Sequence, residues 1–511
     1  MKQRSFFFLC LLLPGLRALS GNYTITDFGA KGDGVTVNTK QIQQAMLSCR
    51  DAGGGTVIVP TGIFVTGTLY LYSNIELHLE SGAVLLGSGN LADYVPASPV
   101  HLGMIYAENA SHITISGEGT IDANGDVFFE RDKAKRIDSA GTVYTRQKEH
   151  FREVKEGIGD GPWVPKDRPY QQFIFSNCRM VTIKDIFITR SAFWTMHFAD
   201  CDAVNVTGIR LWTNMMAPNA DGIDITSCTN VHITGCDIRT GDDAIAIVGY
   251  DHHFEIPGFQ HLRHLSENIT VTDCHLESSS SGIRIGFLDQ NTVRNVQVSQ
   301  VSITNSTRGI GIFLRDQGSL ENLIFSDITI DTHLRTGDWW GNGEPIHISA
   351  IRGKDSVPLG KIRHVQFNNI ICRGENGLLL YGTPESMLED ISFDHIRMEL
   401  TDSKLNEVAG GNIDLRGVSG VKNGLFARDL PGLLIRYARG VSIRDLTLVW
   451  TGARMPFFTH GIELDHFSDV LIRDFQGGAS PANKKAWRIF AQDGTGLTVD
   501  DHTGLMTANV K

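Results

Sequence analysis

Short runs in which apolar and polar residues alternate recur along most of the chain. They include Val181–Ile183, Val204–Val206, Val231–Ile233, Ile269–Val271, Val296–Val298, Val365–Phe367 and Val441–Ile443. Alternation with a period of two indicates a strand with one buried face. A short repeat of such strands, with insertions of variable length, predicts an all-β fold: a single right-handed parallel β-helix whose coils stack on one another. A helix expected over Asn38–Cys49 would cover the first open edge.

The first 20 residues have the pattern of an export signal. Lys2 and Arg4 precede the apolar run Phe6–Leu13, and small residues follow at the cleavage positions. The run is too short to cross a bilayer. We therefore expect a signal peptide over residues 1–20, a secreted or periplasmic protein, and one catalytic β-helix domain over residues 21–511.

Composition excludes several classes of partner. The formal net charge of −11 argues against binding to nucleic acid or to an anionic membrane. Cys178, Cys201 and Cys228 occupy equivalent places in the repeat, where we expect a ladder of buried thiols. The sequence lacks the cysteine and histidine spacing of a zinc site, so we expect no metal and no cofactor. We also expect a monomeric protein.

Two turns of the repeat carry aspartates, at Asn219–Asp221 and Gly241–Asp243. A similar apolar strand follows each turn, and aligning the two strands places Asp221 beside Asp243, with Asp242 next to both. Adjacent strands are about 4.8 Å apart, and like charges this close should leave at least one carboxylate protonated. A protonated acid that faces ionised carboxylates is what glycoside hydrolysis requires. The simpler interpretation is that these are ordinary turn aspartates.

Five short motifs lie between residues 27 and 386. They are Asp27–Gly34, Ser191–His197, Asn219–Asp221, Gly241–Asp243 and Gly382–Ser386. Together they resemble the polygalacturonase-type enzymes of glycoside hydrolase family 28. The resemblance implies a parallel β-helix and cleavage with inversion by direct attack of water. It also implies that Asp242 is the general acid and that Asp221 and Asp243 hold and activate the water, with Asn219 among the substrate-binding residues.

The same region departs from the pattern that the resemblance implies. Ser280 stands where a helper histidine is expected, and we take it as a substrate-binding residue. Gly311 and Phe313 stand where an arginine and a lysine would grip the carboxylate of galacturonate. We therefore expect unsubstituted homogalacturonan to be a poor substrate. A branched, mixed or neutral glycoside should be preferred, with rhamnose-containing pectic chains the first choice.

Strand alternation also predicts which residues face outward beside the aspartates. One column should contain His197, Asp224, Ala246, Arg284, Gly311 and His347. We expect His197, Asp224, Arg284 and His347 to bind substrate. Two alternatives stay open: Arg284 neutralises the aspartates, and His347 is an ordinary residue of the outer face.

A glycine-rich insertion carries Trp339, Trp340 and Glu344. Tryptophan rings stack on sugar rings, and a carboxylate can accept hydrogen bonds from sugar hydroxyls. We expect these residues to form a sugar platform, and a loop packed on the coil is the alternative.

The predicted function is that of an enzyme, a glycosidase that hydrolyses a pectic or related polysaccharide or its oligosaccharides. One alternative is a polysaccharide lyase, in which Asp221, Asp242 and Asp243 bind Ca²⁺ and Arg284 removes a proton. The other is a carbohydrate-binding or epimerising relative that does not hydrolyse its ligand.

Overall fold

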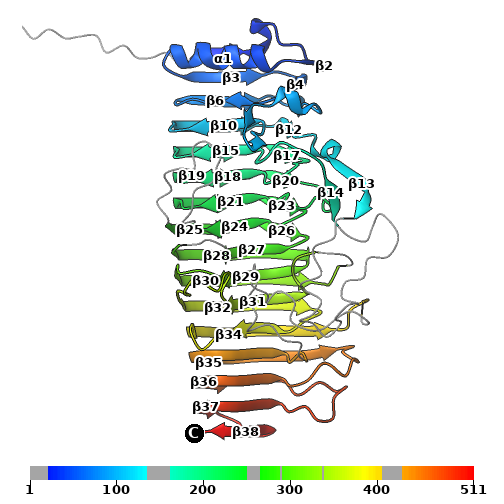
Figure 1. Cartoon of the computed structure of the whole chain (residues 1–511), viewed down its shortest axis with the longest axis vertical. Helices are drawn as coiled ribbons and strands as arrows, with labels where there is room; N and C mark the ends of the chain where they lie inside the picture. Colours follow the sequence, from blue (N-terminus) through cyan, green and yellow to red (C-terminus); the bar gives the residue numbers. More distant parts are fainter. Residues whose placement is uncertain (1–20, 135–161, 250–264, 288–290, 336–338, 406–428) are drawn as a thin grey trace, which may run out of the picture.

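The computed structural model describes residues 21–134, 162–249, 265–287, 291–335, 339–405 and 429–511. In these ranges the strands form the stacked coils of one right-handed parallel β-helix, which confirms the predicted fold class (Figure 1). The predicted signal peptide lies outside the described residues. None of the helices within these ranges has both the length and the apolar character needed to cross a membrane.

Each coil contributes strands to three faces, named I, II and III in the order in which the chain visits them. Face I comprises β5 (Leu69–Tyr70), β10 (Ile105–Glu108), β15 (Phe173–Ser176), β18 (Met196–Ala199), β21 (Ile223–Thr226), β24 (Ile245–Val248), β27 (Ser281–Phe287), β29 (Arg308–Leu314), β31 (Glu344–Ala350), β33 (Leu378–Tyr381), β38 (Leu505–Val510) and the first parts of β35 (Leu433–Thr451), β36 (Ile462–Arg473) and β37 (Ile489–Val499). This face carries the candidate site.

On each of the other two faces, the strands of successive coils also pair in parallel. Face II comprises β1 (Gly21–Thr24), β3 (Gly55–Val59), β6 (Ile75–Leu79), β11 (Ser111–Gly117), β16 (Arg179–Lys184), β19 (Asp202–Thr207), β22 (Thr229–Thr234), β25 (Ser266–Thr272) and the first parts of β28 (Val293–Ser306), β30 (Leu320–Thr332), β32 (Ile362–Gly374) and β34 (Leu388–Thr401). Face III comprises β2 (Asp33–Val37), β4 (Gly62–Thr66), β7 (Ala83–Gly87), β12 (Thr120–Asp122), β17 (Phe187–Thr189), β20 (Arg210–Trp212), β23 (Asp237–Thr240), β26 (His275–Ser278) and the last parts of β28, β30, β32 and β34.

The helix α1 (Thr39–Asp51) covers the N-terminal coil at the blue end of the stack in Figure 1. Its buried residues are Ile42, Ala45, Met46 and Cys49. Their spacing of three and four places them on one helical face, which packs on the first coil. The predicted capping helix is therefore confirmed, and it ends two residues beyond the predicted boundary.

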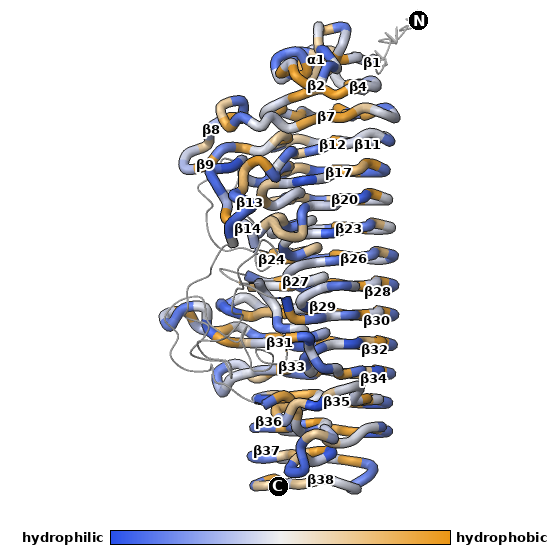
Figure 2. The backbone as a smooth tube through the Cα atoms, turned by 90° about the vertical axis from the view of Figure 1, so that its right-hand side faces the viewer, coloured by the Kyte–Doolittle hydropathy of each residue, from blue (hydrophilic) through white to orange (hydrophobic). Residues whose placement is uncertain are grey.

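The interior is filled by ladders of like side chains. Ile223, Ile245 and Ile283 are register partners in β21, β24 and β27, and all three are fully buried. This confirms the inward ladder on which the predicted position of the aspartates depends. Phe175 and Phe198 stack in the same way, with ring centroids 5.1 Å apart. Figure 2 shows the alternation of hydrophobic and hydrophilic residues along the strands that produces these ladders.

Polar ladders also join successive coils. The amide of Asn322 donates to Asn295, Asn295 to Asn268, and Asn268 to Asn230, at 3.0, 3.2 and 3.3 Å. These asparagines have φ between 56° and 59°, a left-handed conformation that asparagine adopts more readily than most residues. The buried thiols of Cys178, Cys201 and Cys228 stack as predicted; the amide nitrogen of Cys201 lies 3.3 Å from the sulfur of Cys228.

The turns that lead from face III to face I position the candidate site. A small hairpin of β13 (Phe129–Ala134) and β14 (Trp163–Pro165) packs beside one of them. Phe129 and Trp163 cluster with Ala217 and Ala220, in the turn between β20 and β21. A second hairpin, β8 (Pro96–Ala97) with β9 (Val100–His101), projects nearer the N-terminus.

Candidate active site

Three carboxylates meet at the edge of face I, as predicted from the repeat. Oxygen atoms of Asp221, Asp242 and Asp243 lie within 4.8 Å of one another, and each residue is at most 6% exposed. The turns are tight: a Cβ on Gly241 would lie 2.1 Å from the carbonyl oxygen of Ala217. Only glycine therefore fits before the two consecutive aspartates.

Asp243 is held by donors on both of its carboxylate oxygens. The hydroxyl of Ser280 donates to Oδ1 at 2.8 Å, and the backbone N–H of Ser281 donates to the same oxygen at 3.0 Å. The Nε–H of Arg284 donates to Oδ2 in an ion pair. These three donors stabilise Asp243 as an ionised carboxylate.

Asp242 has weaker support for a negative charge. Its carboxylate accepts backbone hydrogen bonds from Asn219 at 3.1 Å and from Asp243 at 3.0 Å. Burial, and then the charge of Asp243, raise the pKa of Asp242 to about 7, against the lowering effect of Arg284. Its backbone is fixed as well, because Thr240 and Ser278 donate hydroxyl hydrogen bonds to its carbonyl oxygen. Near pH 7 this fixed acid therefore still holds part of its proton, beside a carboxylate that three donors bind.

Two further acids share this environment. Burial raises the pKa of Asp221 well above its usual range, with additional contributions from the charges of Asp242, Asp224 and Asp243. Burial is also the main cause that raises the pKa of Asp224. One buried oxygen of each residue, Oδ1 of Asp221 and Oδ2 of Asp224, accepts no hydrogen bond from the described residues. Both oxygens are buried, so their hydrogen-bonding capacity is unused by the described residues.

The predicted outward column is present in register on β18, β21, β24, β27, β29 and β31. It runs through His197, Asp224, Ala246, Arg284, Gly311 and His347. His197 is fully buried, its Nε2 lies 2.8 Å from the hydroxyl of Thr226, and burial lowers its pKa to about 3. We expected His197 to bind substrate, but this neutral ring belongs to the floor beneath Asp224.

Arg284 takes the second of its two predicted roles. Besides the ion pair with Asp243, its Nη1 donates to the carbonyl oxygen of Gly286 at 2.9 Å, and the side chain is 11% exposed. The guanidinium therefore neutralises part of the carboxylate cluster, and substrate binding by Arg284 stays a prediction. Ser280 likewise donates its hydroxyl hydrogen to Asp243.

The coils that follow β27 close the C-terminal side of the cluster with a buried polar network. Arg308 donates from Nε to Glu344 at 2.8 Å, and both side chains are 3% exposed. Glu344 also accepts from the backbone of Asn342, and His347 lies between Glu344 and Ser349 at 3.1 and 3.0 Å. We predicted that Glu344 and His347 bind sugar, but this network occupies their polar atoms.

The aromatic residues on this C-terminal side are packed as well. Trp339 is 2% exposed, so protein covers its ring, and the prediction that it forms an open sugar platform is wrong. Trp340 is half-buried. The ring of Phe313 fills the space above Gly311, where an added Cβ would lie 2.5 Å from its Cε2 atom. Phe313 also lies beneath the guanidinium of Arg308, 4.8 Å from its ring centroid.

Arg168, which the repeat pattern does not point to, lies on the N-terminal side of the cluster. It follows β14, in a connection that has no strand periodicity. Its Nη1 donates to the carbonyl oxygens of Ala192 and Pro218 at 2.6 and 3.0 Å, and its Nη2 donates to the side-chain oxygen of Asn219 at 3.2 Å. Burial lowers its pKa to about 10, while the charges of Asp221 and Asp242 raise it.

A cation would have to compete for part of the cluster. Asp221, Asp242 and Asp243 can each offer one oxygen to a metal ion. Both oxygens of Asp243, however, already accept hydrogen bonds, one of them from the positively charged Arg284. The donor set therefore fits a Ca²⁺ ion poorly, which weighs against the lyase alternative.

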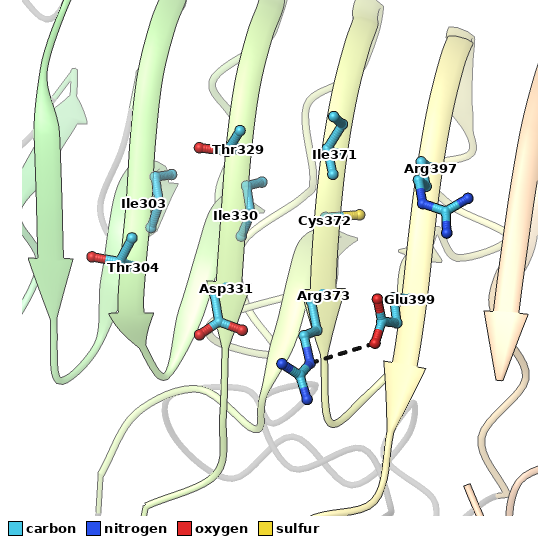
Figure 3. Close-up of a pocket in the computed structure, with 10 residues that line it drawn as sticks. All are labelled: Ile303, Thr304, Thr329, Ile330, Asp331, Ile371, Cys372, Arg373, Arg397 and Glu399. Carbon is cyan, nitrogen blue, oxygen red and sulfur yellow. Dashed lines mark ion pairs between the residues drawn. The ribbon is translucent and has the colours of Figure 1, made fainter. Parts of the chain in front are cut away.

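A separate hollow lies on face III, across β28, β30, β32 and β34 (Figure 3). Arg373 and Glu399 approach one another there at 3.8 Å, and the apolar Ile371 is 56% exposed. Asp331 lines the same hollow, with its pKa raised mainly by burial. The hollow contains none of the clustered aspartates, so the candidate active site is the carboxylate cluster at the edge of face I.

Comparisons with known proteins bear on the family and the fold. The family model "Glycosyl hydrolases family 28" matches residues 49–337, more than half of the chain. The chain is 27% identical over 248 residues to a probable polygalacturonase of Vitis vinifera, covering 45% of each protein. It is 29% identical over 251 residues to the exo-poly-alpha-D-galacturonosidase of Dickeya chrysanthemi, covering 43% of this chain and 41% of the relative. The chain thus spans less than half the length of these two relatives.

Solved structures show the same fold at low identity. The family 28 exopolygalacturonase of Yersinia enterocolitica superposes with a TM-score of 0.61 at 18% identity, over 89% of this chain and 78% of that one. The hyperthermoactive exopolygalacturonase of Thermotoga maritima gives 0.55 at 20% identity, over 90% and 92%. The family match, the shared fold and the three clustered aspartates lead to one conclusion: the chain belongs to glycosyl hydrolases family 28.

Proposed function

We propose that the protein is a glycosidase that hydrolyses a pectic or related polysaccharide, or its oligosaccharides, with inversion of configuration. The observation that carries the proposal is the pairing of two neighbouring carboxylates in opposite states. Asp242 has a pKa raised to about 7, and Asp243 is stabilised as an anion by Ser280, Ser281 and Arg284. Environments that separate two carboxylates in this way define an acid and a base.

In this mechanism Asp242 gives its proton to the glycosidic oxygen as the bond from that oxygen to the anomeric carbon breaks. A water molecule held by Asp221 and Asp243 attacks the anomeric carbon from the opposite face and loses its proton to one of these two carboxylates. The proton that leaves Asp242 is thus balanced by one that the cluster regains.

The short distance between the carboxylates alone favours retention of configuration, since the two carboxyl groups of a retaining glycosidase are about 5 Å apart. We propose direct attack by water instead, because the resemblance to glycoside hydrolase family 28 implies inversion and because the three clustered carboxylates can hold and activate a water molecule.

Asp242→Asn tests the assignment of the acid. Because a general acid contributes about 10²- to 10⁴-fold, kcat should fall at least about 100-fold while circular dichroism stays unchanged. Asp237→Asn, on β23 of the same coil but on face III, is the matched control. Near wild-type turnover in Asp242→Asn would remove Asp242 from the role. NMR of the first product formed should show the anomer opposite to that of the substrate.

The proposed substrate is a mixed or branched glycoside, with rhamnose-containing pectic chains as the first choice. Gly311 and Phe313 provide no cation on the C-terminal side of the cluster, and Arg308 is paired with Glu344. We also propose that the enzyme acts after export, because its first 20 residues have the pattern of a signal peptide.

A further inference from the structure

Three arginines surround the carboxylate cluster, and they differ in their partners. Arg284 is paired with Asp243, and Arg308 is paired with Glu344. Arg168 has no carboxylate within ion-pairing distance among the described residues, and its hydrogen bonds all go to neutral oxygen atoms. A guanidinium carries five N–H donors, and these three bonds leave Nε–H and one Nη2–H of Arg168 for another acceptor.

The guanidinium of Arg168 is held in a fixed orientation. It lies over the rings of Phe129 and Phe193, 5.2 and 4.9 Å from their centroids. The carbonyl oxygens of Ala192 and Pro218 bind one edge of the group, which leaves the remaining donors as a rigid pair. A planar, pre-oriented pair of N–H donors is the geometry that binds a carboxylate with two parallel hydrogen bonds.

The position of Arg168 connects it directly to the reacting groups. Its Nη2 donates to the side chain of Asn219, and the backbone N–H of Asn219 donates to Oδ2 of Asp242. A ligand bound to Arg168 would therefore be separated from Asp242 by the side chain and backbone of Asn219, on the side of the N-terminal coils. Burial lowers the pKa of this guanidinium to about 10, and such a poorly hydrated cation gains from an anionic partner.

Aromatic rings continue from Arg168 along the same side of the site. Tyr170 stacks on Phe193 at 4.2 Å, Phe193 lies beside Trp194 at 5.7 Å, and Trp194 meets His197 edge-on at 5.0 Å. Tyr170, Phe193 and Trp194 are half-buried. Half-buried rings beside a cation are suited to a sugar that has an apolar ring face and a carboxylate.

We propose that Arg168 binds the carboxylate of a uronic acid residue, so that the cleft accepts an acidic sugar on its N-terminal side and a neutral sugar on its C-terminal side. This inference rests on the proposed function, and it names the residue that recognises the charge. It also explains how the site would select a mixed chain, since the C-terminal side offers the buried Arg308–Glu344 pair and the ring of Phe313 in place of an unpaired cation.

The test compares Arg168→Gln with the wild type on two forms of one substrate, a uronate-containing pectic oligosaccharide with free carboxylates and the same oligosaccharide after methyl esterification. Losing a charged hydrogen-bonded pair should raise KM on the free acid about 10- to 100-fold. On the methyl ester KM should change by less than about threefold, because that carboxyl group carries no charge. Arg239→Gln, on face III beside Trp212, is the matched control and should change neither value.

Two outcomes would overturn the inference. An equal loss of kcat on both substrates would mean that Arg168 only positions the Asn219 turn. An unchanged KM on the free acid would mean that it does not contact the substrate. If Arg168→Gln fails to fold, Arg168→Lys replaces it, because lysine keeps the positive charge but cannot form two parallel hydrogen bonds. In Arg168→Lys, KM on the free acid should rise relative to KM on the methyl ester. A ratio of these two KM values equal to that of the wild type would overturn the paired contact.

A binding measurement separates this inference from the proposed function. Calorimetry on the Asp242→Asn variant should show tighter binding of the free acid than of the methyl ester, and adding Arg168→Lys should reduce that preference. A wild type that cleaves no pectic substrate, together with this binding preference, would refute hydrolysis and keep the uronate site. Hydrolysis without the preference would refute the uronate site alone.

Discussion

The two sides of the carboxylate cluster use arginine in opposite ways. On the C-terminal side, Arg308 is buried against Glu344 and covered by Phe313, so its charge is neutralised inside the protein. On the N-terminal side, Arg168 contacts neutral oxygens and aromatic rings among the described residues, and these contacts leave two of its N–H donors. The comparison teaches that the partners of a cation, more than its nearness to the catalytic acids, decide whether it supports the fold or meets a ligand.

The largest effect is expected from breaking the buried pair on the C-terminal side. Glu344→Gln keeps the size of the side chain but removes the negative charge paired with Arg308, in a site where both side chains are 3% exposed. An uncompensated buried charge typically costs about 3–5 kcal/mol, so urea unfolding should show a loss of that size.

Two comparisons sharpen this prediction. The double variant Arg308→Met/Glu344→Leu should recover most of the lost stability, because an apolar pair has no charge to desolvate. Glu385→Gln removes the partner of Arg352 in an exposed ion pair, and its effect should be much smaller. Stability that is unchanged in Glu344→Gln would mean that the C-terminal network is not a structural element.

The adjacent tryptophans should separate packing from ligand contact. Trp339→Ala removes a ring that is 2% exposed and should destabilise the protein by about 3 kcal/mol. Trp340 is half-buried, so Trp340→Ala should cost less stability. Thermal unfolding and KM should be measured on both variants. Equal stability losses would contradict the assignment of Trp339 to the packed interior.

The strand repeat was sufficient to predict that the three carboxylates lie together. Alternation fixes which side chains point inward, and the match of Ile223, Ile245 and Ile283 then requires Asp221 and Asp243 to be neighbours. The same register puts Glu344 directly beside Arg308. The predicted register of Gly311 and His347 already implies this pairing, but the glycine-rich insertion beside Glu344 indicated an exposed loop, which led to the prediction that Glu344 binds sugar.

Arg168 was out of reach of the same reasoning. Its place depends on the hairpin of β13 and β14, which brings Phe129 to the guanidinium, and on the turn that presents Pro218 and Asn219. Loop packing of this kind leaves no periodic signal in the sequence. Trp339 illustrates the opposite error, since a polar, glycine-rich loop predicted exposure and the folded chain buries the ring.

The last predicted effect concerns Asp242, to which Arg168 is linked through Asn219. Its pKa is about 7 in the folded protein and about 3.9 in an unfolded chain. Between these values the folded state binds a proton that the unfolded state lacks, so this contribution to stability is present at low pH and is lost as pH rises toward 7. Asp242→Asn has no such proton. Its stability relative to the wild type should therefore increase from pH 4 to pH 8, as measured by urea unfolding with Asp237→Asn as control. A difference that does not vary with pH would show that Asp242 is not the group that holds the proton.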